Sequence, residues 1–142
     1  MEVRVKDSRH IRRKKKQSKM ISKHRIVEEN KNRGFLSPHY SKKEDCCRFS
    51  IANSYSHEMA KAKICIYLKK NNRKFITEAI MKSGRRADVF DLTQGIVYEV
   101  TETETQKSIK AKRDDYSGLI FVDIPAARIL NATEKHLEKL VN

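Results

Sequence analysis

An uneven distribution of positive charge limits how much of this chain can form a compact fold. Residues 1–43 contain 15 Lys and Arg against 4 Asp and Glu, whereas residues 44–142 contain 17 against 14. The first segment also has few large apolar side chains, so it cannot bury enough surface to offset its conformational entropy. We therefore expect residues 44–142 to form one folded domain, and residues 1–43 to be a partly disordered basic arm and linker that contains at most a short helix.

The basic arm indicates a polyanionic partner. Its densest run, Arg12-Arg13-Lys14-Lys15-Lys16, accounts for much of the surplus behind a net charge of +14. Lys and Arg side chains that neutralise phosphates release condensed counterions, which favours binding without any reading of sequence. Nucleic acid is the favoured partner. An acidic protein, a membrane surface or no partner at all stays open, because a charged tail also keeps a protein in solution.

Several function classes are disfavoured by what the chain lacks. It has no run of about 18 apolar residues and no apolar segment near the N-terminus, so we expect neither a membrane span nor secretion, but a cytoplasmic or nucleoid-associated protein. The three cysteines (Cys46, Cys47, Cys65) show no disulfide or zinc spacing. Only four glycines are present and no phosphate-binding loop is formed, which argues against nucleotide triphosphate hydrolysis.

Hydrophobic periodicity predicts alternating helices and strands after residue 54. A helix begins after Ser54 or Ser56 and continues to Lys70, where Asn71-Asn72 ends it. Strands are predicted at residues 74–81, 87–92, 96–101 and 119–124. Capping boxes at Thr103/Gln106 and Asn131/Glu134 predict the two remaining helices. This order, α-β-β-β-α-β-α, predicts an α/β domain with a mixed central sheet flanked by helices.

The predicted hairpin around Thr93-Gln94 brings two acids together. A two-residue or a four-residue loop places Phe90 opposite Val97 and Asp88 opposite Glu99, with Cβ atoms about 4.5–5.5 Å apart. Paired carboxylates repel each other unless a cation lies between them, and hard oxygen ligands select Mg²⁺ or Mn²⁺. The alternative is that one acid is solvated or pairs with Arg86.

Three short motifs carry a resemblance to a known superfamily. They are Arg86-Ala-Asp88-Val89, Tyr98-Glu99-Val100 and, on the leading helix, Ser56-His-Glu58-Met-Ala-Lys61. In the order α-β-β-β-α-β, they resemble the PD-(D/E)XK, or restriction-endonuclease-like, nucleases over about residues 54–130. The similarity is greatest to small members of the Holliday-junction-resolvase and competence-protein type.

The resemblance implies a site and a chemistry. Asp88, Glu99 and the main-chain carbonyl of Val100 would hold Mg²⁺ or Mn²⁺, and Glu58 would match the acid of the leading helix. The chain departs from the family where the lysine two residues beyond Glu99 is expected, because Thr101 stands there. Lysines from neighbouring elements are the candidates to replace it: Lys107 first, then Lys110 or Lys61.

The favoured interpretation is a metal-dependent nuclease that hydrolyses phosphodiester bonds in DNA, and a homodimer stays open. The residues expected to contact nucleic acid are Arg12, Arg13, Lys14, Lys15, Lys16, Lys61 and Arg86. One alternative is a protein that binds nucleic acid on a nuclease-like scaffold without cutting it, which the absence of the strand lysine favours. Another is a basic interaction protein whose two acids are ordinary surface charges.

Overall fold

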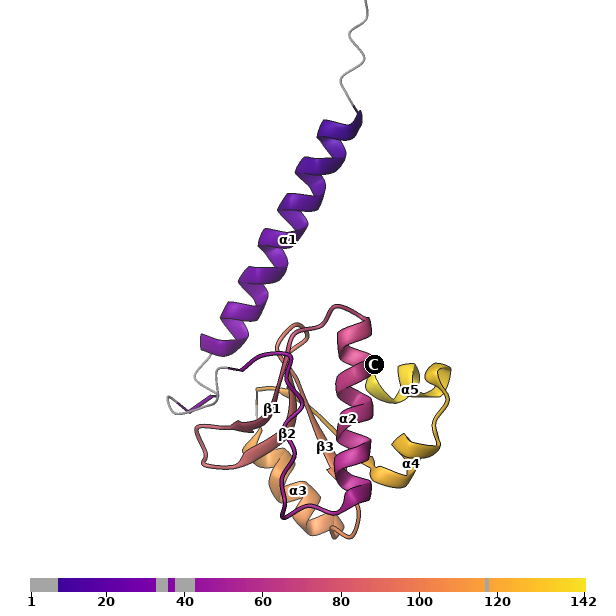
Figure 1. Ribbon diagram of the computed structural model, residues 1–142. Helices are drawn as coiled ribbons and strands as arrows, with labels where there is room; N and C mark the ends of the chain where they lie inside the picture. The colour runs from indigo at the N-terminus through magenta and orange to yellow at the C-terminus, as the bar shows by residue number, and fades with distance from the viewer. Residues whose placement is uncertain (1–7, 33–35, 38–42, 117) are drawn as a thin grey trace, which may run out of the picture.

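A four-stranded mixed sheet lies at the centre of the computed structural model, which describes residues 8–32, 36–37, 43–116 and 118–142 (Figure 1). The strand order is β1-β2-β3-β4. The first three strands run antiparallel, and β4 runs parallel to β3. The strand bounds are β1 Phe75–Ile80, β2 Arg86–Asp91, β3 Ile96–Thr101 and β4 Ile120–Pro125. This arrangement confirms the predicted α/β class with a mixed sheet.

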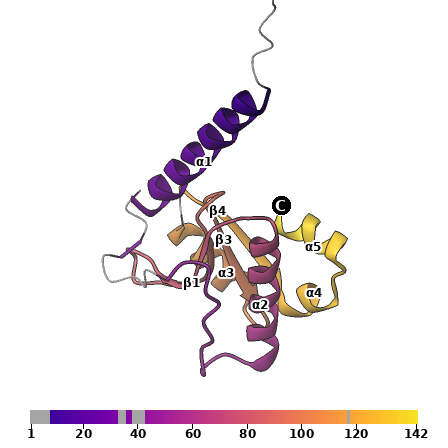
Figure 2. The same cartoon turned by 45° about the horizontal axis from the view of Figure 1, so that its top comes forward.

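Helices cover both faces of the sheet, as Figure 2 shows. Helix α2 (Tyr55–Lys70), with α4 (Ala126–Asn131) and α5 (Glu134–Val141), packs on one face around Ile64 and Tyr98. Helix α3 (Gln106–Asp115) connects β3 to β4, and Tyr116 at its end packs in a second cluster on Phe90 and Val97. None of the helices in the described part of the chain combines the length and the apolar character needed to cross a lipid bilayer.

Helix α2 begins and ends where the sequence predicts. The side chain of Ser54 accepts a hydrogen bond from the backbone N–H of His57, and Asn71 follows the last turn. The other two helix starts were predicted wrongly. Thr105 rather than Thr103 caps α3, and Thr133 rather than Asn131 caps α5. Asn131 instead ends α4, a six-residue helix that is too short to show a helical period in sequence.

The β2–β3 hairpin has the predicted register at its turn. Val89 pairs with Tyr98, Phe90 with Val97 and Asp91 with Ile96. The backbone ladder stops there, because the N–H of Val100 donates to the Asp88 carboxylate at 2.8 Å. A side chain thus takes the place of a backbone acceptor, and the strands part just where the two predicted acids stand.

A buried ion pair connects the hairpin to the end of the chain. Arg73 donates through Nε to the fully buried Asp91 at 2.7 Å, and through Nη2 to Asp91 and to the hydroxyl of Tyr98. Asp91 also accepts from the backbone N–H of Thr93 at 2.9 Å. The Tyr98 hydroxyl in turn donates to the carbonyl of Val141 at 2.7 Å, so the network holds strands, turn and α5 together.

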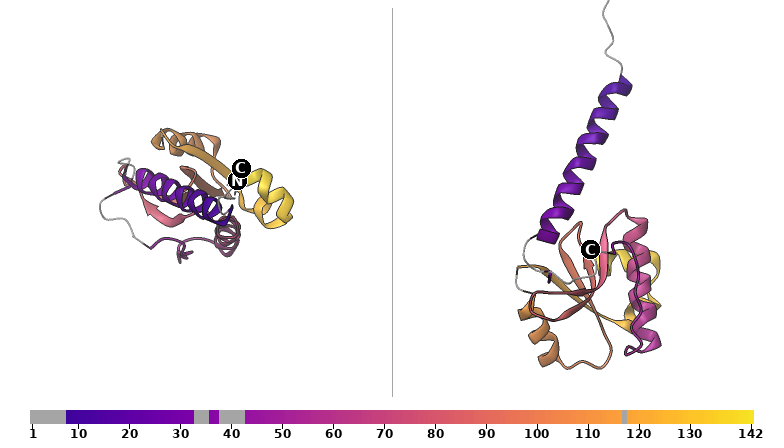
Figure 3. Two further views of the ribbon diagram at one scale, coloured as in Figure 1. Left: turned by 90° about the horizontal axis from the view of Figure 1, so that it is seen from above. Right: turned by 60° about the vertical axis from the view of Figure 1, so that its left-hand side comes forward.

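The basic arm contains a helix where the sequence predicted loosely ordered chain. Helix α1 spans Ser8–Asn32, and it projects from the domain both in Figure 1 and in the right-hand view of Figure 3. Its C-terminal part is attached: Val27 is buried in the second cluster, and the Asn30 side chain donates to the carbonyl of Leu92. Residues 1–7, 33–35 and 38–42 of the predicted arm lie outside the described residues.

Candidate active site

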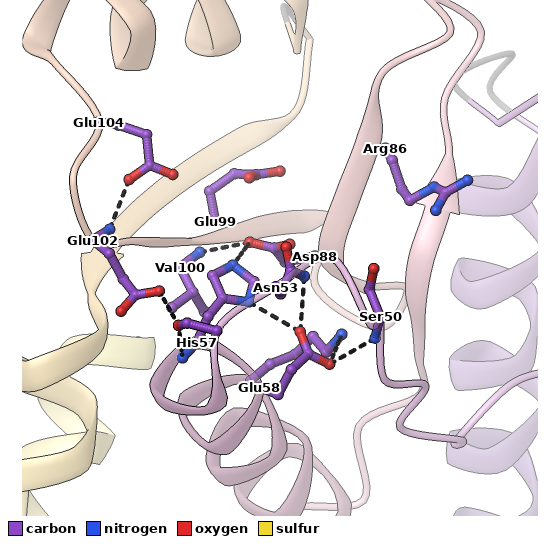
Figure 4. A network of polar contacts seen from close by, with 12 residues as sticks. Ser50, Asn53, His57, Glu58, Arg86, Asp88, Glu99, Val100, Glu102 and Glu104 are labelled. Carbon is purple, nitrogen blue, oxygen red and sulfur yellow. Dashed lines mark hydrogen bonds and ion pairs between the residues drawn. The ribbon is translucent and has the colours of Figure 1, made fainter.

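A polar cavity of about 380 Å³ opens where β2 and β3 part. Its lining comes from the segment before α2, the first turn of α2, three strands and the region around α3, as Figure 4 shows for most of these residues. The residues that line it are Ser50, Ala52, Asn53, Ser54, His57, Glu78, Arg86, Asp88, Glu99, Glu102, Thr103, Glu104 and Lys112. The cavity therefore combines several carboxylates with three cationic groups.

Three of these acids come from three neighbouring strands. Thr77 pairs with Val89 and Ala79 with Ala87, so Glu78 stands opposite Asp88. Glu99 lies on β3, on the other side of β2, one residue beyond the last hairpin pair, Val89 with Tyr98. Asp88 and Glu99 line the same cavity, as the hairpin predicted.

Glu78, which the sequence offers as an outer-shell carboxylate if its face turns inward, lines the cavity, and its backbone is unusual. Its φ of 52° lies in the left-handed region, which residues other than glycine seldom adopt. Such strain persists only where the surrounding structure holds it, and it is often found at functional sites. Here the Glu78 carboxylate is held by Lys61 at 2.6 Å, while Arg86 lies 3.8 Å away at the exposed side.

Glu99 is a buried acid in an unfavourable electrostatic position. Its side chain accepts from the Tyr116 hydroxyl at 3.2 Å, and Lys112 Nζ lies 3.6 Å from Oε2. Burial, and next the charge of Asp88, raise the pKa of Glu99 to about 8, although Lys112 and Tyr116 act in the opposite direction. The ionised pair of carboxylates therefore lacks sufficient positive charge around it.

His57 bridges the first turn of α2 to the strand acid. Nε2 lies 3.2 Å from Asp88 Oδ2, and Nδ1 lies 3.1 Å from Glu58 Oε1. The hydrogen bond with Asp88 is the main reason that the pKa of His57 is raised to about 9, so the imidazole is charged at neutral pH. The sequence indicated only a capping, surface or phosphate-orienting histidine. Its position three residues after the Ser54 cap was the available signal.

Glu58 supports the site from behind and does not line the cavity. Its carboxylate accepts from the backbone N–H of Ser50 at 3.0 Å and from Asn53 at 2.8 Å, and pairs with Lys61 at 2.8 Å. Burial alone would raise its pKa, but these contacts and that of His57 lower it to about 2. Glu58 is thus an ionised anchor for its neighbours, and its predicted role as a water-mediated metal ligand stays a prediction.

Lys61 was predicted to contact nucleic acid, and the structure shows that this is wrong. Its side chain is fully buried between Glu58 and Glu78. Burial would lower its pKa, but hydrogen bonds to both carboxylates raise it, so the ammonium stays charged. Three residues separate Glu58 from Lys61, which puts both on the side of α2 that faces the sheet.

The lysine beside the acids is Lys112, which the sequence did not select. Lys107 and Lys110, the predicted candidates on α3, are exposed and do not line the cavity. Lys112 lies 3.6 Å from both Glu99 and Glu104. Lys112 follows Lys107 by five residues, which places the two side chains about 140° apart around the helix axis. The buried Ile109 marks the inner face, and Lys112 follows it at the i+3 position.

The remaining predicted residues fall into two groups. Arg86 is exposed at the rim of the cavity, whereas Val100 contacts Asp88 through its N–H; its carbonyl as a metal ligand stays a prediction. In the predicted basic run on α1, the side chain of Lys14 lies outside the described residues. The exposed arm residues of the predicted run are Arg12, Arg13, Lys15 and Lys16.

The donor set of the cavity fits a hard dication with few protein ligands. Within the described ranges, no group of three or more His, Cys, Asp and Glu side chains is arranged to hold a metal ion. Asp88 and Glu99 are two carboxylates, and Mg²⁺ in phosphate-processing sites is often held by one or two carboxylates with water and phosphate oxygens. A dication would also favour the ionised form of Glu99, whose pKa is raised by burial and next by the charge of Asp88.

Comparison with known proteins gives no relative. No family model, curated protein or solved structure matches the chain.

Proposed function

We propose that this protein is a metal-dependent nuclease that hydrolyses phosphodiester bonds in DNA, on a nuclease-like core formed by α2-β1-β2-β3-α3-β4. One observation carries the proposal. Asp88 and Glu99, 9% and 3% exposed, line one polar cavity from adjacent strands. Lys112 stands beside Glu99, where it supplies the positive charge that the strand lacks at Thr101.

Each residue of the cavity has a part in the proposed chemistry. A bound Mg²⁺ or Mn²⁺ polarises a phosphate and lowers the pKa of a coordinated water. Asp88 and Glu99 hold this cation. Both described hydrogen bonds of the Asp88 carboxylate are made by Oδ2, so the carboxylate would keep an oxygen for the cation. Lys112 stabilises charge that develops on the phosphate, and Arg86 at the exposed rim contacts a neighbouring phosphate oxygen.

The lysine assignment makes a sharp prediction, because α3 offers a matched control. Lys112→Met is expected to lower the cleavage rate on the order of 100-fold, since a charge-stabilising donor is lost from the site. Lys107→Met, on the exposed side of the same helix, is expected to cleave at the wild-type rate. Single-turnover assays on a labelled substrate measure both. Equal losses, or a loss with Lys107→Met alone, would refute the assignment of Lys112.

Helix α1 supplies affinity for the nucleic acid backbone. We expect Lys15→Gln/Lys16→Gln to reduce the slope of log K against log salt concentration by about 0.9 for each phosphate contact removed. The control is Lys135→Gln/Lys139→Gln, which removes the same charge from exposed positions on a different helix, α5. Fluorescence anisotropy across a salt series gives both slopes. Identical slopes for the two variants would show that the arm is not the binding element.

The decisive test is cleavage by the full chain. Labelled linear, forked and single-stranded DNA, and a matched RNA, are incubated with Mg²⁺ or Mn²⁺ and resolved by denaturing electrophoresis. We expect cleavage of at least one DNA substrate that EDTA stops and that added metal restores. Binding without cleavage of any substrate would instead identify the second candidate function.

That second candidate, a nucleic-acid-binding protein that does not cut, is favoured by one contact. The charged imidazole of His57 already neutralises Asp88, which is the role that a metal would otherwise have. A His57→Gln variant distinguishes the two. In a nuclease it changes the metal concentration needed for half-maximal cleavage, whereas in a binding protein no metal concentration produces cleavage.

A further inference from the structure

The segment before α2 presents apolar side chains to solvent beside a polar cavity. Phe49 is 69% exposed, Ile51 is fully exposed and Tyr55 is 80% exposed. The residues between them, including Ser50 and Ser54, line the cavity. Large apolar side chains in a folded domain are mostly buried. In this segment they face solvent instead, while polar neighbours line the cavity.

Hydrogen bonds to the site hold this segment in place. The backbone N–H of Ser50 and the side chain of Asn53 both donate to Glu58, at 3.0 and 2.8 Å. The Asn53 N–H closes a turn on the Ser50 carbonyl at 3.2 Å. Ser54 caps α2 and donates to Glu102. The exposed rings are therefore presented by a fixed backbone, which lowers the entropy lost when a ligand binds.

We propose that Phe49 and Tyr55 form a stacking site for unpaired nucleobases next to the phosphate that is cut. This inference rests on the proposed function and names its substrate class: DNA with single-stranded or branched segments. Aromatic side chains stack on bases of any sequence, but the faces of paired bases inside a duplex are covered by their neighbours. Unpaired bases alone offer a free face to these rings.

Charge around the rings supports a nucleotide as the occupant. Arg48 is exposed directly before Phe49, and Arg86 is exposed on the rim of the cavity that Ser50 also lines. Cationic groups beside aromatic ones match a ligand that alternates phosphates with flat, apolar bases.

A second copy of the chain is the rival occupant, because apolar exposure continues along α2. Met59 is 43% exposed and Ile66 is 57% exposed. The most exposed apolar residues, however, are those adjoining the cavity. Ile66 lies about 16 Å along the helix from Tyr55, at 1.5 Å per residue. This separation makes Ile66 the control position, since a protein interface would include it and a base-stacking site would not.

The test measures binding without metal, so that cleavage plays no part. Full-length protein in EDTA is titrated into fluorescein-labelled forked DNA and into a blunt duplex of the same length. The variants are Phe49→Ser/Tyr55→Ser, the aromatic exchange Phe49→Tyr/Tyr55→Phe, and Ile66→Ser. A 2-aminopurine base in the unpaired arm reports stacking through quenching of its fluorescence.

We expect the double serine variant to lose affinity for the fork on the order of tenfold for each stacked base, about 1.4 kcal/mol, and to abolish the quenching. Its affinity for the duplex stays unchanged, and the aromatic exchange and Ile66→Ser behave as wild type. An equal loss on fork and duplex, or no loss, overturns the stacking site. So does a self-association that Ile66→Ser and the serine variant both abolish in sedimentation. A protein that binds forks in this way yet never cuts would refute the proposed catalysis and leave the stacking site standing.

Discussion

Asp88→Asn and Glu99→Gln are each expected to lower metal-dependent cleavage by on the order of 10³-fold or more, while binding to the same DNA stays within experimental error of wild type. Each amide keeps the volume of the acid it replaces and removes the charge that would hold the cation. Asn at position 88 can still accept from the N–H of Val100, so the parted strands keep their contact. Single-turnover cleavage and anisotropy on one labelled substrate measure both quantities.

The control for this pair is Asp123→Asn. Asp123 is the register partner of Glu99 on β4, but it pairs with Arg113 at 2.9 Å and does not line the cavity. We expect full activity from it. Glu99→Gln should also be at least as stable to heat as wild type at neutral pH, because burial and the charge of Asp88 raise the pKa of Glu99, so that folding forces this acid to take up a proton that an amide does not need. Wild-type cleavage by either site variant would refute the assignment of Asp88 and Glu99.

Asp91→Ala is expected to cause the largest loss of stability of any single change proposed for this protein, about 3–5 kcal/mol. The substitution leaves Arg73 charged and buried without its partner. It also removes the acceptor for the backbone N–H of Thr93 in the hairpin turn. Equilibrium unfolding in urea, with the slope compared between variants, measures the change in free energy.

The matched control is Glu134→Ala, which breaks an ion pair with Lys70 that is largely exposed. Exposed pairs contribute about 0–1 kcal/mol, so this variant is expected to unfold close to the wild-type midpoint. A small effect of Asp91→Ala, similar to that of the control, would show that the Arg73 network does not hold the sheet to α5. In that case the order of the hairpin would depend on apolar packing alone.

The pattern of apolar residues and the residue types at the turns predicted the fold well. Runs of strand-forming and apolar residues gave the four strands, and the turn at Thr93-Gln94 gave the register that pairs Val89 with Tyr98, the residues next to Asp88 and Glu99. Strands follow local rules of this kind, because one slip in register would move a whole apolar set to the wrong face. Helix α4 was missed because six residues after Pro125 are too few to show a period.

The side chains around the acids were harder to predict, because which of them face the acids depends on how the helices are rotated and packed against the sheet. In the sequence, Lys107 is closer than Lys112 to the end of β3. The rotation of α3 about its own axis decides which of the two lysines faces Glu99, and that lysine is Lys112. The sequence alone gives Lys61 the character of a surface charge, but in the folded protein its side chain is buried. His57 gains its importance from Asp88, 31 residues away, and no local pattern records that contact.

In the DNA complex that we propose, the attachment of α1 near one end sets how far along a duplex this protein would extend. At 1.5 Å per residue, Arg12 lies about 22 Å from Val27, the buried point of attachment. A duplex advances about 3.4 Å per base pair, so the arm covers roughly six base pairs beyond the body of the domain. The footprint on DNA should therefore be lopsided, with the extra protection on one flank of the cut and absent from the other.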